Sequence, residues 1–293
     1  MDTVTPAARL RALLDRPGLH VMPCCFDALS ARLIERAGFA LTFMSGFAVS
    51  AARLALPDVG LASFGEMRDQ LRDIAAAVSI PVLADGDTGY GNAVNVKRTV
   101  REYARAGAAA VMIEDQVWPK RCGHTRGKQV VAFEEAVARV RAACDARDEG
   151  ADILILARTD ARATHGLEEA LRRIRAFDEA GADILFLEGP CDIAEMEAFC
   201  RATARPTLAN MVEGGDTPLL PPAELEAIGY RIVAYPLTLL SAAVRAMEAA
   251  LDALARGRTP WPLLLPFSGL QRRLGFPDYD REAARYAVGR EGG

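Results

Sequence analysis

The sequence predicts one closed (β/α)8 barrel, a TIM barrel, followed by a C-terminal helical extension. The chain has 293 residues, and eight strand–helix units need about 250 residues. A phrase also recurs along the chain: a glycine, a short apolar run and then a charged residue, at 106–115, 150–158 and 180–189. Apolar runs without alternation are typical of strands that are buried on both faces, as in parallel sheets.

Extended in both directions, the phrase predicts eight strands. They lie near Leu19–Met22, Ala40–Met44, Pro81–Ala84, Ala109–Ile113, Ile153–Ala157, Ile184–Leu187, Thr207–Ala209 and Arg231–Ala234. Amphipathic stretches of helical length follow most of them, such as 133–147, 167–179 and, after the last strand, 237–255. Strict alternation implies parallel strands joined by crossover helices. Eight units favour a closed barrel, and no G-x-G-x-x-G follows the first strand, which argues against a dinucleotide-binding fold.

The sequence changes in character beyond Gly257, where it reads RTPWPLLLPFSGLQRRLGF. This segment contains prolines, Trp261 and Phe267, but no ninth strand–helix unit. We therefore expect a barrel catalytic domain over residues 1–256 and an extension over residues 257–293. The apolar side chains of the extension need another surface to cover them, either the barrel or a neighbouring subunit.

Composition narrows the class of protein. The net charge is −4, with both signs mixed along the chain, which excludes the concentrated basic surface of a nucleic-acid binder. No apolar run approaches the roughly 18 residues of a membrane span, and the N-terminus has no signal-peptide pattern. The six cysteines form no CxxC pair, which favours reduced thiols over a disulfide framework. We expect a cytoplasmic protein.

Acidic residues follow the third, fourth and sixth predicted strands. They are Asp85, Asp87, Glu114 and Glu188. Barrels of this kind carry their active sites at the C-terminal ends of the strands, so these side chains should meet at one rim. Carboxylates that converge need either protons or a cation, and Mg2+ prefers such oxygen ligands. The alternative is that each acid caps the following helix or pairs with Arg158.

A long loop from Gln116 to Gln129 carries the second group of candidates, in the order Lys120, Arg121, Cys122, Gly123 and His124. Loops of this length in compact domains are usually functional. Cationic neighbours make a thiol a competent proton donor or nucleophile near neutral pH. The alternative is a chance cysteine in a basic surface loop. We expect the other cysteines to be packing residues: Cys24, Cys25, Cys144, Cys191 and Cys200.

Two further strand ends suit an anionic substrate. Arg158 follows the fifth strand, and an arginine there can bind a planar carboxylate through two hydrogen bonds. Ser45 and the backbone amides of Gly46 and Phe47 follow the second strand and can hold another anionic oxygen. A glycine at that point allows the backbone to approach a ligand closely.

Five motifs then occur in consistent order. They are SGFAVSAARLALPD (45–58), DGDTGYGNAVNVKRTV (85–100), IEDQVWPKRCGH (113–124), ARTDA (157–161) and LANMVEGGDTP (208–218). Together they resemble the isocitrate lyase/phosphoenolpyruvate mutase superfamily over nearly the whole chain. The resemblance points to its branch of 2-methylisocitrate lyases, 2,3-dimethylmalate lyases and oxaloacetate hydrolases.

The resemblance implies a role for each candidate residue. Asp85 would be the nearest protein ligand of Mg2+, for which Mn2+ is a possible substitute, and Asp58, Asp87 and Glu114 would act largely through bound waters. Ser45, Gly46, Phe47 and Arg158 would contact the oxyacid part of the substrate. Cys122 would be the catalytic acid, on a gating loop with Lys120, Arg121, Gly123 and His124. Glu188 and Asn210 would complete the pocket. The family also implies a homotetramer that exchanges its C-terminal helices.

The implied reaction is cleavage of a small 2-hydroxy di- or tricarboxylic acid to a 2-oxo acid such as pyruvate and a carboxylic acid. The 2-hydroxyl loses its proton, the adjacent C–C bond breaks, and Cys122 protonates the carbanion. Family mutases generally have Asn in place of Cys122, so the thiol favours a lyase or hydrolase. Methylisocitrate lyases usually have Thr and Arg where this chain has Val212 and Ser241, and Arg245 is the candidate replacement.

We therefore expect a 2-alkylmalate-type lyase. The alternatives are a 2-methylisocitrate lyase, an oxaloacetate hydrolase or decarboxylase, a phosphonate mutase, and a non-catalytic barrel that binds Mg2+ and an oxyacid.

Overall fold

The computed structural model describes residues 4–123, 125 and 127–287. The chain divides into two compact units, Met1–Leu240 and Ser241–Gly293. The first unit contains the whole barrel. The boundary after residue 256, which the sequence suggests for the catalytic domain, stays a prediction.

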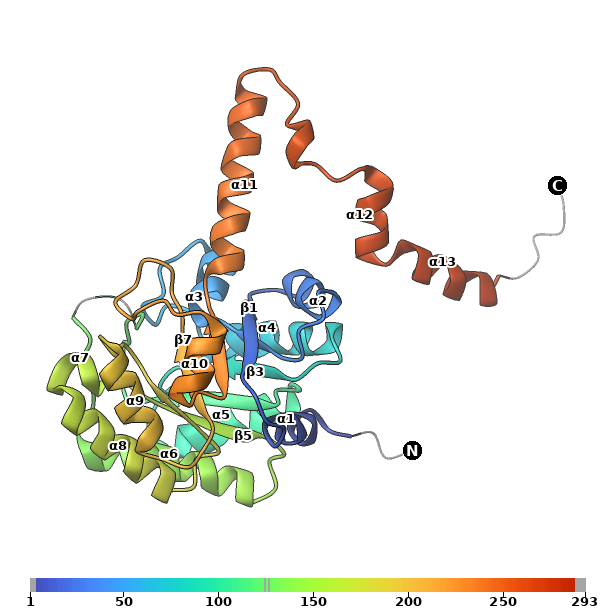
Figure 1. Ribbon diagram of the computed structural model, residues 1–293. Coiled ribbons are helices and arrows are strands. Elements are labelled where there is room, and N and C mark those ends of the chain that lie inside the picture. The colour runs from blue at the N-terminus through green and yellow to red at the C-terminus, as the bar shows by residue number, and fades with distance from the viewer. Residues whose placement is uncertain (1–3, 124, 126, 288–293) are drawn as a thin grey trace, which may run out of the picture. The chain divides into compact units, whose positions relative to one another are not determined.

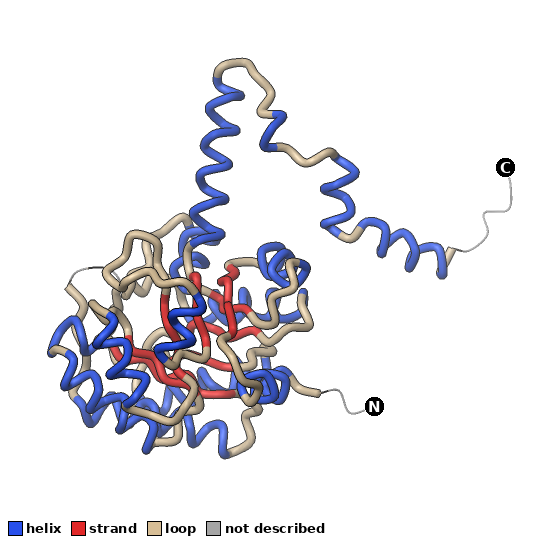
Figure 2. Tube along the Cα trace, viewed as in Figure 1, coloured by secondary structure: helices blue, strands red, loops and turns tan. Residues whose placement is uncertain are grey.

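Eight parallel strands close into a barrel, each paired with the next in the chain and the last with the first. They are β1 (His20–Cys25), β2 (Thr42–Met44), β3 (Val82–Asp85), β4 (Ala110–Glu114), β5 (Leu154–Thr159), β6 (Ile184–Leu187), β7 (Thr207–Asn210) and β8 (Ile232–Tyr235). Each overlaps one strand expected from the sequence, so the (β/α)8 barrel is confirmed. The strands lie inside a ring of helices (Figure 1, Figure 2).

The helices of the first unit alternate with the strands. They are α1 (Pro6–Leu14), α2 (Ala28–Arg36), α3 (Gly46–Val49), the π-helix η1 (Ser50–Leu54), α4 (Phe64–Ala77), α5 (Ala93–Arg105), α6 (Phe133–Asp148), α7 (Ala161–His165), α8 (Leu167–Glu179), α9 (Ile193–Arg201) and α10 (Pro222–Ile228). α2, α4 and α5 each begin with a reciprocal capping box, in which Asp27, Ser63 and Asn92 accept backbone N–H groups. The helices predicted over 133–147 and 167–179 are confirmed as α6 and α8.

The strands are buried on both faces, as their unalternated apolar runs indicate. In β4, Val111 and Ile113 pack in the larger core beneath the surrounding helices, whereas Met112 packs in the smaller core inside the barrel. β1 divides in the same way, with Cys25 in the larger core and Cys24 in the smaller. This period of two decides which residues at the strand ends face the barrel axis.

The second unit contains helices but no strand among its described residues. α11 (Thr238–Ala255) runs into it and is followed by the 3-10 turn η2 (Trp261–Leu263), α12 (Phe267–Leu274) and α13 (Phe276–Arg285). Large apolar side chains are exposed along it in the single chain, with Phe267 75% and Trp261 73% exposed. These side chains need a cover, as the sequence indicates. None of the described helices is long and apolar enough to cross a membrane.

Candidate active site

The period of two carries five polar side chains to one rim of the barrel. Inside the barrel, each strand from β3 to β7 ends with an apolar residue in the inner core and then, two positions on, a polar residue. These pairs are Leu83 and Asp85, Met112 and Glu114, Leu156 and Arg158, Phe186 and Glu188, and Leu208 and Asn210. Since parallel strands end at the same rim, these five polar side chains converge there, although the sequence separates them widely.

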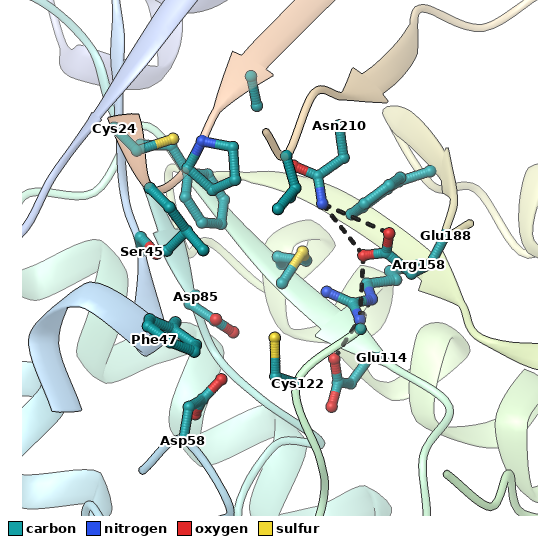
Figure 3. A pocket seen from close by; sticks show the side chains of 18 of the residues that line it. Cys24, Ser45, Phe47, Asp58, Asp85, Glu114, Cys122, Arg158, Glu188 and Asn210 are labelled. Carbon is teal, nitrogen blue, oxygen red and sulfur yellow. Dashed lines mark hydrogen bonds and ion pairs between the residues drawn. The ribbon is translucent and has the colours of Figure 1, made fainter. Parts of the chain in front are cut away.

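A pocket opens at this rim, and most of the predicted site residues line it (Figure 3). Those residues are Ser45, Phe47, Asp58, Asp85, Glu114, Lys120, Arg121, Cys122, Gly123, Arg158, Glu188 and Asn210. Gly46 and Asp87 stand behind the wall in contact with Asp85. His124 lies outside the described residues. The carboxylates of Asp58, Asp85 and Glu114 and the Cys122 thiol face the same space in Figure 3.

Three carboxyl groups in the pocket are buried and crowded. Burial, and then the negative charge of Asp87, raise the pKa of Asp85 to about 6. Burial also raises the pKa of Asp58, and it holds the pKa of Glu114 well above its usual range despite the nearby Arg158. A cation placed among these groups would therefore relieve a real electrostatic cost.

Lys120 supplies part of that positive charge. Its ammonium lies 2.6 Å from Asp58 Oδ1 and 2.8 Å from Asp87 Oδ1, and its side chain is only 4% exposed. The second contact is an ion pair by distance, although no hydrogen bond of good geometry reaches Asp87 Oδ1 from the described groups. Burial disfavours the charged amine, but the surrounding acids outweigh it and raise the pKa of Lys120 well above its usual value. Lys120 thus connects the Cys122 loop to the acidic cluster, which consists of Asp58, Asp85, Asp87 and Glu114.

The same acids suit a hard divalent cation. Each of them would offer the ion carboxylate oxygens, the ligands that Mg2+ prefers. Glu114 Oε1 is fully buried yet has no hydrogen-bond partner among the described residues, so the site contains a lone pair available to a ligand. No three His, Cys, Asp or Glu side chains in the described part of the chain converge closely enough to bind one ion directly. This arrangement fits an ion that keeps several waters and takes few direct protein ligands.

Arg158 is held by acids on several sides. Its Nε and Nη2 donate to the two oxygens of Asp160 at 2.8 and 2.9 Å. Glu188 lies 3.2 Å from Nη2, and Glu114 lies 3.4 Å from Nε. The guanidinium also sits 5.2 Å from the centre of the Phe186 ring. Asp160 fixes the arginine in place because it lies two positions further along the same side of the chain.

The second strand end contributes a serine and a close backbone approach. Ser45 caps α3 by accepting the Ala48 amide at 3.3 Å, and it is nearly fully buried. The Gly46 amide donates to Asp85 Oδ2 at 3.2 Å, so in this structure it serves the acid. A Cβ atom at Gly46 would stand 2.4 Å from Asp85 Oδ2, which explains why a glycine occupies the position.

The Cys122 loop comes equally close to the opposite wall. Cys122 itself is half-buried and lines the pocket. A Cβ atom at Gly123 would stand 2.4 Å from Glu188 Oε2 and 2.6 Å from Arg158 Nη2. The backbone next to the thiol therefore rests directly on the Arg158–Glu188 pair, an approach that only glycine permits.

Several lining residues had no predicted role in the pocket: Cys24, Phe43, Met112, Phe186, Leu208 and Ala234. For all of them except Cys24, the signal in the sequence is a place two residues before another lining residue at the end of the same strand, on the same side of that strand. Cys24 was expected only to pack. It is buried and does so, and burial raises the pKa of its thiol well above the ordinary value.

The expectation for the remaining cysteines holds in part. Cys25 and Cys144 are buried and Cys200 is half-buried, as packing residues should be. For Cys191 the expectation was wrong, because its side chain is exposed. Cys191 lies in the turn between β6 and α9, and the apolar character of the preceding strand does not extend to it.

Comparisons with known proteins identify the family of the chain. A family model described as phosphoenolpyruvate phosphomutase matches residues 10–255. The chain is 45% identical over 287 residues to 2,3-dimethylmalate lyase of Eubacterium barkeri, covering 97% of this chain and 99% of that protein. It is 40% identical over 282 residues to 2-methylisocitrate lyase of Aeropyrum pernix, covering 95% and 90%.

Two solved structures resemble the chain over nearly all of its length. One is oxaloacetate acetylhydrolase in complex with the inhibitor 3,3-difluorooxalacetate, with a TM-score of 0.91, 37% identity, and coverage of 96% of this chain and 98% of that one. Another is phosphonopyruvate hydrolase in complex with oxalate and Mg2+, with a TM-score of 0.86, 33% identity, and coverage of 96% and 99%. The chain therefore belongs to the phosphoenolpyruvate mutase/isocitrate lyase superfamily, which the motifs of the sequence predicted, and its relatives include named carbon–carbon lyases.

Proposed function

We propose that the protein is a Mg2+-dependent carbon–carbon lyase that cleaves a 2-alkylmalate-type acid into a 2-oxo acid such as pyruvate and a carboxylic acid. The observation that carries the proposal is a single pocket lined by Asp85, Glu114, Arg158 and Cys122. Asp85 and Glu114 supply acidic groups that can hold Mg2+. Arg158 supplies a positive charge that can bind a substrate carboxylate, and Cys122 supplies a thiol that can donate a proton. The lyases among the relatives support the same reaction class.

Asp85 would hold the metal ion most closely. Asp58, Asp87 and Glu114 would reach the ion largely through its waters, which agrees with the spacing of these acids. When bound, Mg2+ would draw electron density from the 2-hydroxyl and the neighbouring carboxylate and so ease loss of the hydroxyl proton. Mn2+ is a possible substitute because it accepts the same ligands. The Mg2+ in the phosphonopyruvate hydrolase structure supports this choice.

Arg158 would bind the carboxylate next to the 2-hydroxyl group. Its fixed position between Asp160 and Glu188 means that little side-chain freedom is lost when substrate binds. The Ser45 hydroxyl accepts the Ala48 amide and can donate its own proton to a substrate oxygen. Glu188 and Asn210, whose side chains are 3.3–3.4 Å apart, complete this side of the pocket.

The bonds change in three steps. A carboxylate of the acidic cluster takes the proton of the 2-hydroxyl, and the oxygen's electron pair forms the carbonyl of the 2-oxo acid. The bond between C2 and C3 breaks, and its electron pair stays on C3, where the adjacent carboxylate stabilises it. Cys122 then donates its proton to C3 and becomes a thiolate. The proton held by the carboxylate returns to the sulfur, so the cycle closes without a net gain or loss of protons.

The far wall of the pocket favours an alkyl group over a third carboxylate. It consists of Phe186, Leu208, Val212, Pro236 and Leu237. Among the described lining residues, Lys120 and Arg158 already face acids of the protein, and Arg121 belongs to the Cys122 loop rather than to this wall. A third carboxylate against this wall would lose its water without a matched charge, a cost of several kcal/mol. We therefore rank 2-methylisocitrate below a 2-alkylmalate.

Oxaloacetate hydrolysis is the second candidate. The likeness to oxaloacetate acetylhydrolase favours it, because the inhibitor in that structure is an analogue of a 2-oxo dicarboxylate. Both reactions break the bond between C2 and C3 and leave a carbanion for a proton donor. They differ in that hydrolysis adds water at C2 and releases oxalate and acetate.

The test is product analysis with purified enzyme. 2,3-Dimethylmalate, 2-methylisocitrate and oxaloacetate are each supplied with and without EDTA, and pyruvate and oxalate are measured. We expect pyruvate from 2,3-dimethylmalate, lost in EDTA and restored by Mg2+. Oxalate from oxaloacetate as the main product would favour the second candidate, and no product from any of the three would refute a lyase.

Cys122→Ser tests the proton donor, with Cys191→Ser as the matched control at an exposed thiol outside the pocket. General acid catalysis is worth about 100- to 10,000-fold, so Cys122→Ser should lose that much turnover and Cys191→Ser none. Unchanged turnover in Cys122→Ser would remove the thiol from the mechanism.

We also propose that the protein is a cytoplasmic homotetramer whose C-terminal helices cross to a neighbouring subunit. The exposed apolar side chains of the second unit, among them Trp261 and Phe267, support this arrangement because each needs a covering surface. Light scattering after gel filtration should give four times the chain mass. Truncation after Gly257 should reduce the assembly, and a monomeric full-length chain would contradict the proposal.

A further inference from the structure

The loop that carries Cys122 begins and ends on a short two-stranded neck. Gln116 pairs with Val130 in an antiparallel bridge. The Val117 amide donates to Gln129 O at 2.8 Å, and the Val131 amide donates to Asp115 O at 2.9 Å. The neck fixes the two ends of the loop but leaves the position of the thiol to contacts further along.

Gln116 makes two of those contacts with one residue. Its side-chain Nε2 donates to Arg121 O, and its Oε1 accepts the Arg121 amide, both at 2.9 Å. Gln116 is itself 1% exposed, and its backbone carbonyl accepts Arg139 Nη1 at 2.8 Å. The side-chain amide of Gln116 therefore holds the backbone immediately before Cys122. Gln116 is itself held in place by its burial and by the hydrogen bond from Arg139.

Lys128 holds the backbone immediately after Cys122. Its ammonium donates to Gly123 O and also to Asp160 Oδ1, the latter at 2.9 Å. The side chains of Lys128 and Asp160 are 5% and 0% exposed. Because Asp160 also binds Arg158 through both oxygens, a single carboxylate links the loop to the proposed substrate anchor.

We propose that Gln116 and Lys128 are positioning residues, a two-point clamp that fixes Cys122 in the pocket from the residues on either side of it. Displacement of the loop would break the paired hydrogen bonds to Arg121 and would leave the buried Lys128 without Gly123 O. Buried charged donors lose stability when an acceptor is removed, so the clamp favours the position in which Gly123 rests against Glu188 and Arg158. The inference rests on the proposed function only for the role of Cys122 as the acid.

The test is the rate at which iodoacetamide alkylates Cys122, measured peptide by peptide by mass spectrometry. The exposed Cys191 provides the internal reference, and the buried Cys144 reports unfolding. Lys128→Met and Gln116→Met should each raise the ratio of Cys122 to Cys191 labelling by about tenfold. This is the change in the population of the displaced loop that is expected when a buried hydrogen bond is lost. Loss of a nearby cation would by itself slow alkylation, because cations favour the thiolate, so faster labelling reports the loss of position.

Two controls separate the clamp from general effects. Lys97→Met makes the same substitution at an ion pair with Glu149 on the surface of α5, and it should leave the ratio unchanged. Lys128→Arg keeps a buried cation and should restore most of the protection. Where Cys144 also becomes labelled, the milder Lys128→Gln is measured in place of the methionine variant.

Kinetics give a second readout. A displaced thiol lowers kcat, whereas KM changes little because Arg158 keeps its two hydrogen bonds to Asp160. An unchanged labelling ratio in both methionine variants would overturn the clamp, whatever their activity. If the wild-type enzyme cleaves no substrate, the labelling still tests the clamp, and the proposed function fails separately.

Discussion

Gly123→Ala is the substitution for which the structure gives the sharpest expectation. The new methyl group would stand 2.4 Å from Glu188 Oε2 and 2.6 Å from Arg158 Nη2, both well inside van der Waals contact. Glu188 is fully buried and Arg158 is bound by Asp160, so neither can retreat easily. The loop must move instead, and it carries the neighbouring thiol with it.

The size of the effect follows from the overlap. Relief of such a contact needs a shift of about 1 Å, and a displacement of that size at a reacting group costs roughly 100-fold in rate. At 1.36 kcal/mol for each factor of ten, the loss of transition-state stabilisation is about 2.7 kcal/mol. We expect most of it in kcat, because the pocket walls that bind substrate are unchanged.

The assay compares kcat and KM for pyruvate release by wild type, Gly123→Ala and Gly65→Ala. Gly65 lies in α4, where a Cβ atom would meet its nearest neighbour at 4.0 Å. The control should keep full activity and gain about 0.5–1 kcal/mol of stability, since alanine is the better helix former. A Gly123→Ala enzyme within twofold of wild type would refute the reasoning, because the loop would then not need to rest on the Arg158–Glu188 pair.

Three further predictions can be measured on the same preparations. At about 100 times its Kd, Mg2+ should stabilise the fold by about 2.7 kcal/mol in a thermal melt. Asp85→Asn should abolish this shift, whereas Asp69→Asn, at a half-buried ion pair with Arg68 outside the pocket, should keep it. A shift retained in Asp85→Asn would exclude that acid as the main ligand. The hydrogen bonds from Arg162 lower the pKa of Glu195 below its ordinary 4.5. This pair therefore stabilises the fold above pH 4.5, and the stabilisation is lost as the pH falls through the lowered pKa. The difference between the urea midpoints of wild type and Glu195→Gln should disappear on acidification, and a difference independent of pH would contradict this prediction. Arg245→Ala should leave kcat/KM for 2,3-dimethylmalate within twofold, and a large loss confined to 2-methylisocitrate would show that Arg245 binds a third carboxylate.

The barrel and its rim residues could be predicted because they depend on local rules. A buried strand shows as a short apolar run, and the residue after it must lie at the common rim, which is how Glu114, Arg158 and Glu188 were found. Asp58 was found only through family resemblance. It follows the irregular segment after η1, and no periodic pattern places it near Asp85.

The interior of the Cys122 loop could not be predicted in the same way. The sequence shows a run of cations around a thiol, which suggests that they all act on the sulfur. In the structure Lys120 turns to Asp58 and Asp87, and Lys128 turns to Asp160, 32 positions along the chain. Such pairings depend on which carboxylates the fold brings near, and loop composition alone does not contain that information.

The apolar layer directly beneath the site has a consequence for how the enzyme can be altered. Leu83, Met112 and Leu156 complete a packed interior, and the ionisable groups stand on top of it, partly dehydrated and close to charges of the same sign. The acidic groups that the proposed reaction needs therefore lower the free energy of unfolding. Replacing Asp85 with Asn, which removes one of the crowded charges with little change of volume, should give an inactive protein that melts at a higher temperature. Selection for heat resistance alone would therefore favour inactive variants of this kind. A screen for stabilised variants of this protein must measure turnover at the same time.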